Sequence, residues 1–199
     1  MKQLIICATI YLLVVAANSC VKPCHEPDYN FLVTDFFAPE KDSISRGDTL
    51  FLVCIIPKME KDINTQMAVN FSNLANLGDH VVISDISKFD TQRDAVDNFS
   101  FVSIEGKIYS DQNGAKQLNF AETDSTYQLK IGLIALKAGL YILTIPDVPG
   151  VYRKGSIHCG VGNFQILNSN SNKHLYLFEN MWGPLSAYDA AHCFCFKVN

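Results

Sequence analysis

The sequence predicts an all-β domain that folds as an antiparallel β-sandwich. Short runs of apolar, β-branched and aromatic residues recur along the 199 residues, with Gly, Pro, Asn and Asp between them. Runs of this length separated by turn residues are typical of sandwiches. No segment longer than about ten residues has the apolar spacing of a helix. We therefore expect a single β-sandwich domain over residues 29–199.

The first half of this domain predicts a series of strands. Residues 29–37 alternate loosely between apolar and polar side chains. Residues 49–56, TLFLVCII, are apolar throughout and end at Pro57, which predicts a central strand or one buried on both faces. The Asn113–Gly114 pair predicts a tight turn between strands. Further strands are expected over residues 67–73, 80–89 and 98–110, the last of them interrupted at Glu105–Gly106.

The strongest pattern is YQLKIGLIALKAGLYILTI, residues 127–145. Alternation along its first arm, a turn at LKAG and an apolar second arm predict two consecutive strands. Its Gly139-x-Tyr141-x-Leu143 pattern resembles the corner of immunoglobulin-like sandwiches, in which a tyrosine hydroxyl bonds back to the backbone. The resemblance implies an immunoglobulin-like antiparallel β-sandwich, with Tyr141 serving folding rather than binding.

The last third is less regular. Its glycines and its Asn-Ser run predict long loops around one strand, residues 163–167. Residues 174–182, HLYLFENMW, fit either a strand or a short helix. Ser186 followed by Asp189 predicts a capped helical turn. Residues 192–198, HCFCFKV, predict a closing strand with Cys193 and Cys195 on one face and His192, Phe194 and Phe196 on the other.

The N-terminal leader predicts export. Lys2 precedes fourteen uncharged residues, Leu4 to Ala17, and this layout is typical of a signal peptide, whereas a membrane span needs about 20 apolar residues. The segment VAANSC, ending at Cys20, resembles the lipobox of bacterial lipoproteins. The resemblance implies a lipoprotein signal peptide over residues 1–19, acylation of the Cys20 thiol, and a tether over residues 20–28. The alternative is ordinary cleavage, giving a soluble secreted protein.

The charge of the chain limits the classes of partner that it can bind, and its cysteines bear on the disulfide bonds expected outside the cytoplasm. Removing Lys2 leaves 15 of the 16 basic residues against 20 acidic ones, a net charge of −5. Because the basic residues are scattered, we expect no nucleic-acid partner. Of the seven cysteines, Cys7 leaves with the leader and Cys20 is assigned to lipid, so five remain. Outside the cytoplasm we expect Cys159 to pair with Cys195 or Cys193.

Two stretches resemble an uncharacterised Bacteroides-type lipoprotein family. The first runs from the tether to KDSISRGDTLFL, which ends at residue 52, and the second runs from HLYLFENMW to CFCFKV. The resemblance implies a signal peptide, a tether and a β-sandwich-like domain in the cell envelope, held to the membrane by its lipid. The resemblance implies no known activity and no catalytic residue for this chain. The resemblance does not say which membrane carries the protein or which side of that membrane the domain occupies.

No motif for catalysis, phosphate binding or dinucleotide binding is present. We expect no cofactor and no metal, since His-Cys neighbours on a strand point to opposite faces. The lone tryptophan, Trp182, lies near Phe178 and Tyr188. These aromatic side chains are candidate contacts for an unknown protein or glycan. The reading we favour is that they cap an open end of the sandwich.

The function expected from these observations is non-catalytic. An envelope-anchored lipoprotein would serve in binding, adhesion or assembly, with an unknown ligand. Two alternatives stay open: an extracytoplasmic hydrolase whose site leaves no linear motif, and a soluble secreted protein with disulfide bonds.

Overall fold

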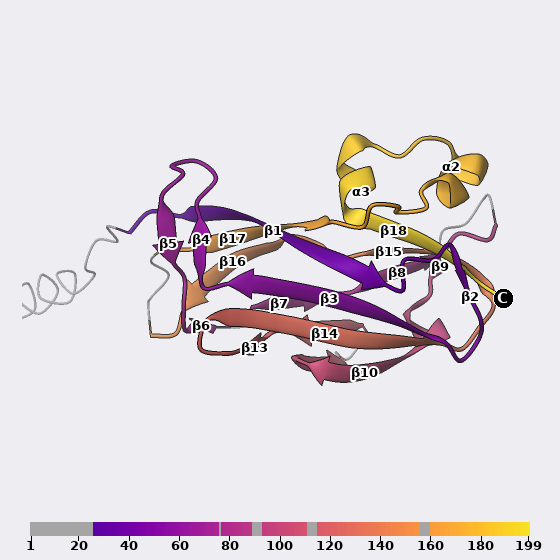
Figure 1. Cartoon of the computed structure of the whole chain (residues 1–199), viewed down its shortest axis with the longest axis horizontal. Coiled ribbons are helices and arrows are strands. Elements are labelled where there is room, and N and C mark those ends of the chain that lie inside the picture. Colours follow the sequence, from indigo (N-terminus) through magenta and orange to yellow (C-terminus); the bar gives the residue numbers. More distant parts are fainter. Residues whose placement is uncertain (1–25, 76, 89–92, 111–114, 156–159) are drawn as a thin grey trace, which may run out of the picture.

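The computed structural model describes residues 26–199 except 76, 89–92, 111–114 and 156–159. This part of the chain is built mainly of strands (Figure 1). The expected signal peptide, Cys20 and the first part of the tether lie outside it, so they stay predictions. Within the described residues, no helix has the length and apolar character needed to cross a bilayer.

The larger sheet has eight strands in the order β10-β14-β3-β1-β17-β16-β6, with β13 also paired to β14. The neighbours β1 and β17 are parallel, whereas β3 is antiparallel to both β1 and β14. Its strands are β1 (Tyr29–Ala38), β3 (Thr49–Pro57), β6 (Leu74–Ala75), β10 (Phe99–Glu105), β13 (Ala121–Glu122), β14 (Thr126–Ala135), β16 (Val148–Arg153) and β17 (Gly162–Asn168).

The second sheet has five strands in the order β2-β18-β15-β8-β9. Phe37 of β1 stacks on Phe194 of β18 with ring centroids 5.0 Å apart, so the two sheets pack face to face. Buried residues from both sheets form one hydrophobic core. The all-β class and the sandwich-like packing are thereby confirmed. The strands are β2 (Ser43–Ile44), β8 (Val82–Asp85), β9 (Arg93–Asp94), β15 (Gly139–Thr144) and β18 (Cys193–Val198).

Smaller elements extend the sandwich. Strands β4 (Met59–Lys61) and β5 (Ala68–Asn70) form a hairpin. A three-stranded sheet, β11-β12-β7, begins where the chain leaves β10 at Gly106, whose φ of 89° favours glycine. The predicted interruption is therefore confirmed, but the Asn113–Gly114 turn lies outside the described residues. The remaining elements are β7 (Gly78–His80), β11 (Lys107–Ser110), β12 (Lys116–Asn119) and the 3-10 helix η1 (Val96–Asn98).

Two short helices, α2 (Tyr176–Trp182) and α3 (Ala187–His192), precede β18 (Figure 1). Residues 174–182 are thus mostly helical. Ser186 caps α3, because its Oγ accepts a hydrogen bond from the Asp189 backbone N–H at 3.1 Å. The predicted cap is confirmed. His192 ends α3 instead of starting the closing strand.

The apolar strand β3 is central, as predicted, but it is not buried on both faces. Its burial alternates: Leu50, Leu52, Cys54 and Ile56 face the core, whereas Ile55 is 51% exposed. Of the two predicted alternatives, the central position is therefore confirmed and burial on both faces is not. The prediction for the residues of β16 was also wrong: Pro149 and Gly150 indicated a loop, whereas the structure has a strand.

Tyr141 has the folding role that the sequence predicts. Strands β14 and β15 belong to different sheets, so the chain crosses the sandwich between them. The Tyr141 ring is fully buried, and its hydroxyl donates to the Lys137 carbonyl at 3.1 Å. A Cβ at Gly139 would lie 2.8 Å from that hydroxyl oxygen, which explains the glycine.

Candidate functional site: an amide-lined groove

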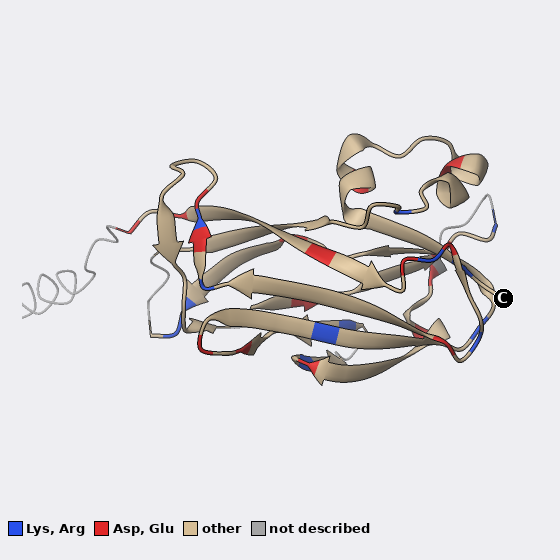
Figure 2. Cartoon of the chain, viewed as in Figure 1, with Lys and Arg blue, Asp and Glu red and all other residues tan. Residues whose placement is uncertain are grey.

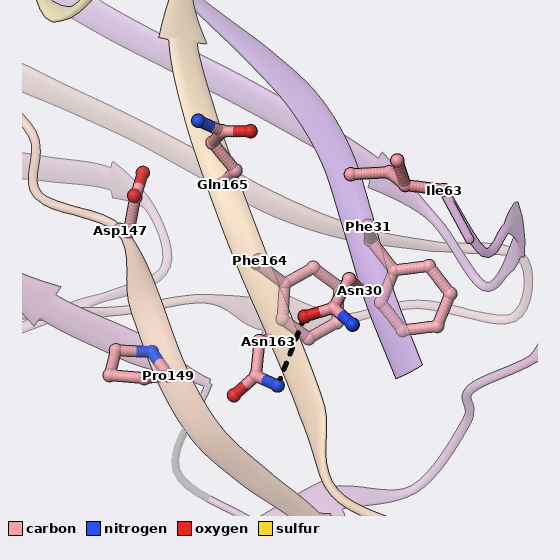
Figure 3. Close-up of a pocket in the computed structure, with 8 residues that line it drawn as sticks. All are labelled: Asn30, Phe31, Ile63, Asp147, Pro149, Asn163, Phe164 and Gln165. Atoms are coloured by element: carbon pink, nitrogen blue, oxygen red, sulfur yellow. Dashed lines mark hydrogen bonds between the residues drawn. The ribbon is translucent and has the colours of Figure 1, made fainter. Parts of the chain in front are cut away.

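A groove of about 290 Å³ lies beside the first residues of β1 and β17 (Figure 3). Phe31 and Phe164 line it from the core side, with ring centroids 5.0 Å apart. This volume is near the lower end of small-molecule sites, which span roughly 300–1,000 Å³. The other lining residues are Asn30, Ile63, Asp147, Pro149, Asn163 and Gln165.

The parallel pairing of β1 with β17 brings the amide side chains together. Asn30 lies opposite Asn163, and Leu32 lies opposite Gln165. Because side chains alternate along a strand, Asn30, Asn163 and Gln165 all point away from the core while the intervening phenylalanines point into it. A row of amides on a rigid sheet results.

Two of these amides keep free hydrogen-bonding groups. Asn163 is committed, since its Nδ2 donates to Asn30 Oδ1 at 3.3 Å and its Oδ1 accepts from Gly150 N at 3.0 Å. The Gln165 amide makes no hydrogen bond to any other residue that the structure describes, nor does Asn30 Nδ2. An amide offers both donors and acceptors, so the groove can pair with a ligand that does the same.

Among the described lining residues, only Asp147 carries a charge. Its Oδ1 accepts from the Ile166 backbone N–H at 3.0 Å, and its Oδ2 accepts from the Tyr188 hydroxyl at 3.1 Å. His192 Nε2 lies 3.3 Å from Oδ1, although its orientation does not form a hydrogen bond. The carboxylate is thus occupied by structural partners. Elsewhere, charged residues are dispersed over the molecule (Figure 2).

Tyr188 borders the groove through this contact with Asp147. Its side chain is 54% exposed, and its ring packs against the His192 ring at 4.0 Å between centroids. His192 is in turn fixed by Nδ1, which lies 2.6 Å from the Tyr188 carbonyl oxygen. Desolvation and then the hydrogen bond to Asp147 raise the pKa of Tyr188, so the hydroxyl stays a neutral donor.

The other two predicted ligand contacts lie elsewhere. Phe178 and Trp182 stack on α2 with ring centroids 6.0 Å apart, packed against a second buried cluster that includes Ile142 and Cys195. Trp182 Nε1 donates to the Ile86 carbonyl at 3.2 Å. Both rings therefore cover the outer face of the second sheet. Phe178 also lines a smaller pocket of about 220 Å³ there.

The cysteines of β18 lie under these helices. Cys193 and Cys195 are buried free thiols on one face of the strand, and Phe194 and Phe196 face the core, as predicted. Burial raises the pKa of Cys195 to about 12. Cys159, their expected partner, lies outside the described residues, so the disulfide stays a prediction. No group of three or more His, Cys, Asp or Glu residues in the described chain is arranged to hold a metal ion.

Sequence reasoning missed the amide row. The fragments YNFLV and GNFQI each place an asparagine before a phenylalanine in a predicted strand, which indicates an outward amide beside an inward ring. Their parallel pairing is the missing information, because Asn30 and Asn163 are 133 residues apart.

The sequence matches no protein-family model, and no curated protein matches it. Among solved structures, the chain is similar to the human F-spondin reeler domain (fragment 1). The identity is 9%, the match covers 91% of this chain and 99% of that chain, and the TM-score is 0.40. A likeness at this level carries no argument about function.

Proposed function

We propose that the protein is an envelope lipoprotein, anchored through acylated Cys20, whose amide-lined groove binds an uncharged ligand rich in hydroxyl groups, that is, a glycan. The lipobox-like segment before Cys20 supports the anchor. Two or three acyl chains hold a protein on a bilayer far more firmly than one.

The observation that carries the binding proposal is the free amide of Gln165, which lines the same groove as Asn30. Sugar hydroxyls both donate and accept, so they complement amide groups. Pro149 and Ile63 add apolar surface to the same groove, and such surface suits the C–H faces of a sugar ring. An uncharged ligand is favoured over an anionic one, because Asp147, the one charged residue among the described lining residues, is acidic.

The same contacts support binding without catalysis. A general base must reach the substrate with a free lone pair and a pKa suited to the task. Both Asp147 oxygens accept structural hydrogen bonds, and His192 is buried, with its Nδ1 against the Tyr188 carbonyl oxygen.

We also propose that the sandwich is immunoglobulin-like. The buried Tyr141 hydroxyl, bonded to the backbone four residues upstream, supports this finer assignment. So does the passage of the chain between sheets at the same corner.

Calorimetric titration of the purified protein with neutral oligosaccharides tests the binding proposal. We expect saturable binding that Gln165→Ala weakens by about tenfold, the value of one or two hydrogen bonds. Gln117→Ala is the matched control, because Gln117 is a partly buried strand glutamine that does not line the groove.

Four outcomes would count against the proposal, two for the groove and two for the anchor. Equal binding by both variants would exclude the groove as the site, and cleavage of the bound oligosaccharide would favour the hydrolase. For the anchor, palmitate labelling that persists in Cys20→Ala, or partitioning of the unaltered protein into the aqueous phase of a detergent extract, would contradict acylation at Cys20.

A further inference from the structure

The β4–β5 hairpin presents long apolar side chains to solvent. Met59 is 56% exposed and Met67 is 67% exposed, and neither lines the groove. Lys61, also exposed, lies on the same hairpin. Exposed apolar side chains of this size are favourably buried when an apolar phase is within reach.

The hairpin is held firmly despite this exposure. The Asp62 carboxylate accepts from the Asn30 N–H and from the Thr65 N–H, each at 2.8 Å. The Ile63 N–H donates to the Asn30 carbonyl at 2.7 Å. Val69 of β5 packs against the core. The two methionines are therefore held outward by the fold.

The hairpin lies where the chain enters the domain. Glu26, the first described residue, is paired with the guanidinium of Arg153. The same guanidinium donates to the Asn70 carbonyl of β5 at 2.8 Å and lies 4.7 Å from the centroid of the Phe71 ring. Figure 1 shows β4 and β5 at this end, with the C-terminus at the other.

The remaining chain is too short to carry this end far from an anchor. Glu26 is six residues after Cys20, and six extended residues span at most about 20 Å. Acyl chains on Cys20 would hold the end of the domain that bears Met59 and Met67 within that distance of the membrane surface.

We propose that Met59 and Met67 insert into the same bilayer that holds the Cys20 lipid, with Lys61 among the headgroups, so that the domain has a fixed orientation on the membrane. This inference rests on the anchoring proposed above. A weak contact is sufficient, since the anchor makes it intramolecular. Unbranched, flexible methionine suits an irregular acyl surface.

Tryptophan reporters in the full chain test this contact. Met67→Trp and Leu136→Trp are compared in acylated protein reconstituted into phosphatidylcholine vesicles that contain some phosphatidylglycerol and lipids with brominated acyl chains. The unaltered chain, with Trp182 alone, gives the background. Leu136 is the matched control, because it is 51% exposed and lies at the opposite end of the domain from the hairpin. The carbonyl of the preceding residue, Ala135, accepts a hydrogen bond from the Gly47 N–H near the C-terminal end.

We expect the Met67→Trp signal to be quenched at least about threefold more than that of Leu136→Trp, because interfacial side chains reach the boundary of headgroups and acyl chains. Met59→Trp gives the same reading if Met67→Trp does not fold.

Equal quenching in protein whose Cys20 carries an acyl mass overturns the inference and leaves the anchor intact. If no acyl mass is found, the anchor fails. Unacylated protein at saturating lipid then decides: selective quenching of the hairpin reporter supports membrane contact, and its absence overturns it.

Discussion

Asp35 is a carboxyl group buried between the two sheets. It is 1% exposed, and its Oδ1 has no hydrogen-bond partner among the residues that the structure describes. Desolvation raises the pKa of Asp35 from 3.8 to about 7, and the charge of Lys173 only partly opposes this. A carboxyl group that is neutral when folded and ionised when unfolded makes stability depend on pH.

We expect the free energy of unfolding to fall as pH rises through this window. Below pH 3.8 the group is protonated in both states; between 3.8 and about 7 only the unfolded chain releases the proton, which favours unfolding. Between pH 5 and 8 the loss should be about 3 kcal/mol. Urea unfolding at the two pH values measures it.

The matched variant is Asp35→Asn, which should lose most of this pH dependence. Lowered carboxyl pKa values, such as those of Glu40 and Asp42, act in the opposite direction and at lower pH, so they do not mask the effect. Equal dependence in both proteins would contradict a neutral, buried Asp35.

Helix α3 connects the groove to the second sheet. Its cap at Ser186 fixes the helix start, and Tyr188 then meets Asp147. Ser186→Ala should lower the free energy of unfolding by about 1 kcal/mol, as measured by urea titration. Ser100→Ala, an exposed serine on β10, should be nearly neutral. If the two variants are equally stable, the cap does not stabilise α3.

The sequence predicted individual elements better than their partners. Alternation identified β1, and the Gly139-x-Tyr141 pattern identified the corner, because both signals are local. Strand β16 was missed because Pro149 and Gly150 are read as loop residues, although the strand tolerates them at a register shift between Val148 and Val151.

The groove could not be predicted in the same way. Its residues come from strands far apart in the chain, and the parallel β1–β17 pairing that aligns Asn30 with Asn163 has no local signature. Trp182 was named as a candidate ligand contact because it is the lone tryptophan, but its ring covers the second sheet. Tyr188 was named as a candidate ligand contact, and its hydrogen bond to Asp147 could be seen only in the structure.

Arg153 joins the chain at Glu26 to the β4–β5 hairpin. Arg153→Met would keep apolar contact with Phe71 but lose the pairing with Glu26 and the hydrogen bond to Asn70. We expect several-fold faster hydrogen exchange in β5 and residues 26–28, because local opening becomes easier. Lys154→Met is the control at an exposed neighbour. Unchanged exchange in Arg153→Met would show that these contacts do not hold the two segments together.

The hairpin also borders the groove, since Ile63 lies between its strands and lines the site. A ligand bound there would lie near the end of the domain that we propose to face the membrane. Anchor, hairpin and groove would then act at one end of the sandwich.

Binding in the amide-lined groove is tested most directly by an NMR titration of the isotopically labelled protein with neutral oligosaccharides, following the side-chain amide resonances. We expect the resonances of Gln165 and Asn30 to shift with ligand while those of Gln117 do not. Shifts confined to the Trp182 indole and its neighbours, or no shift in the groove at saturating ligand, would contradict binding in the groove.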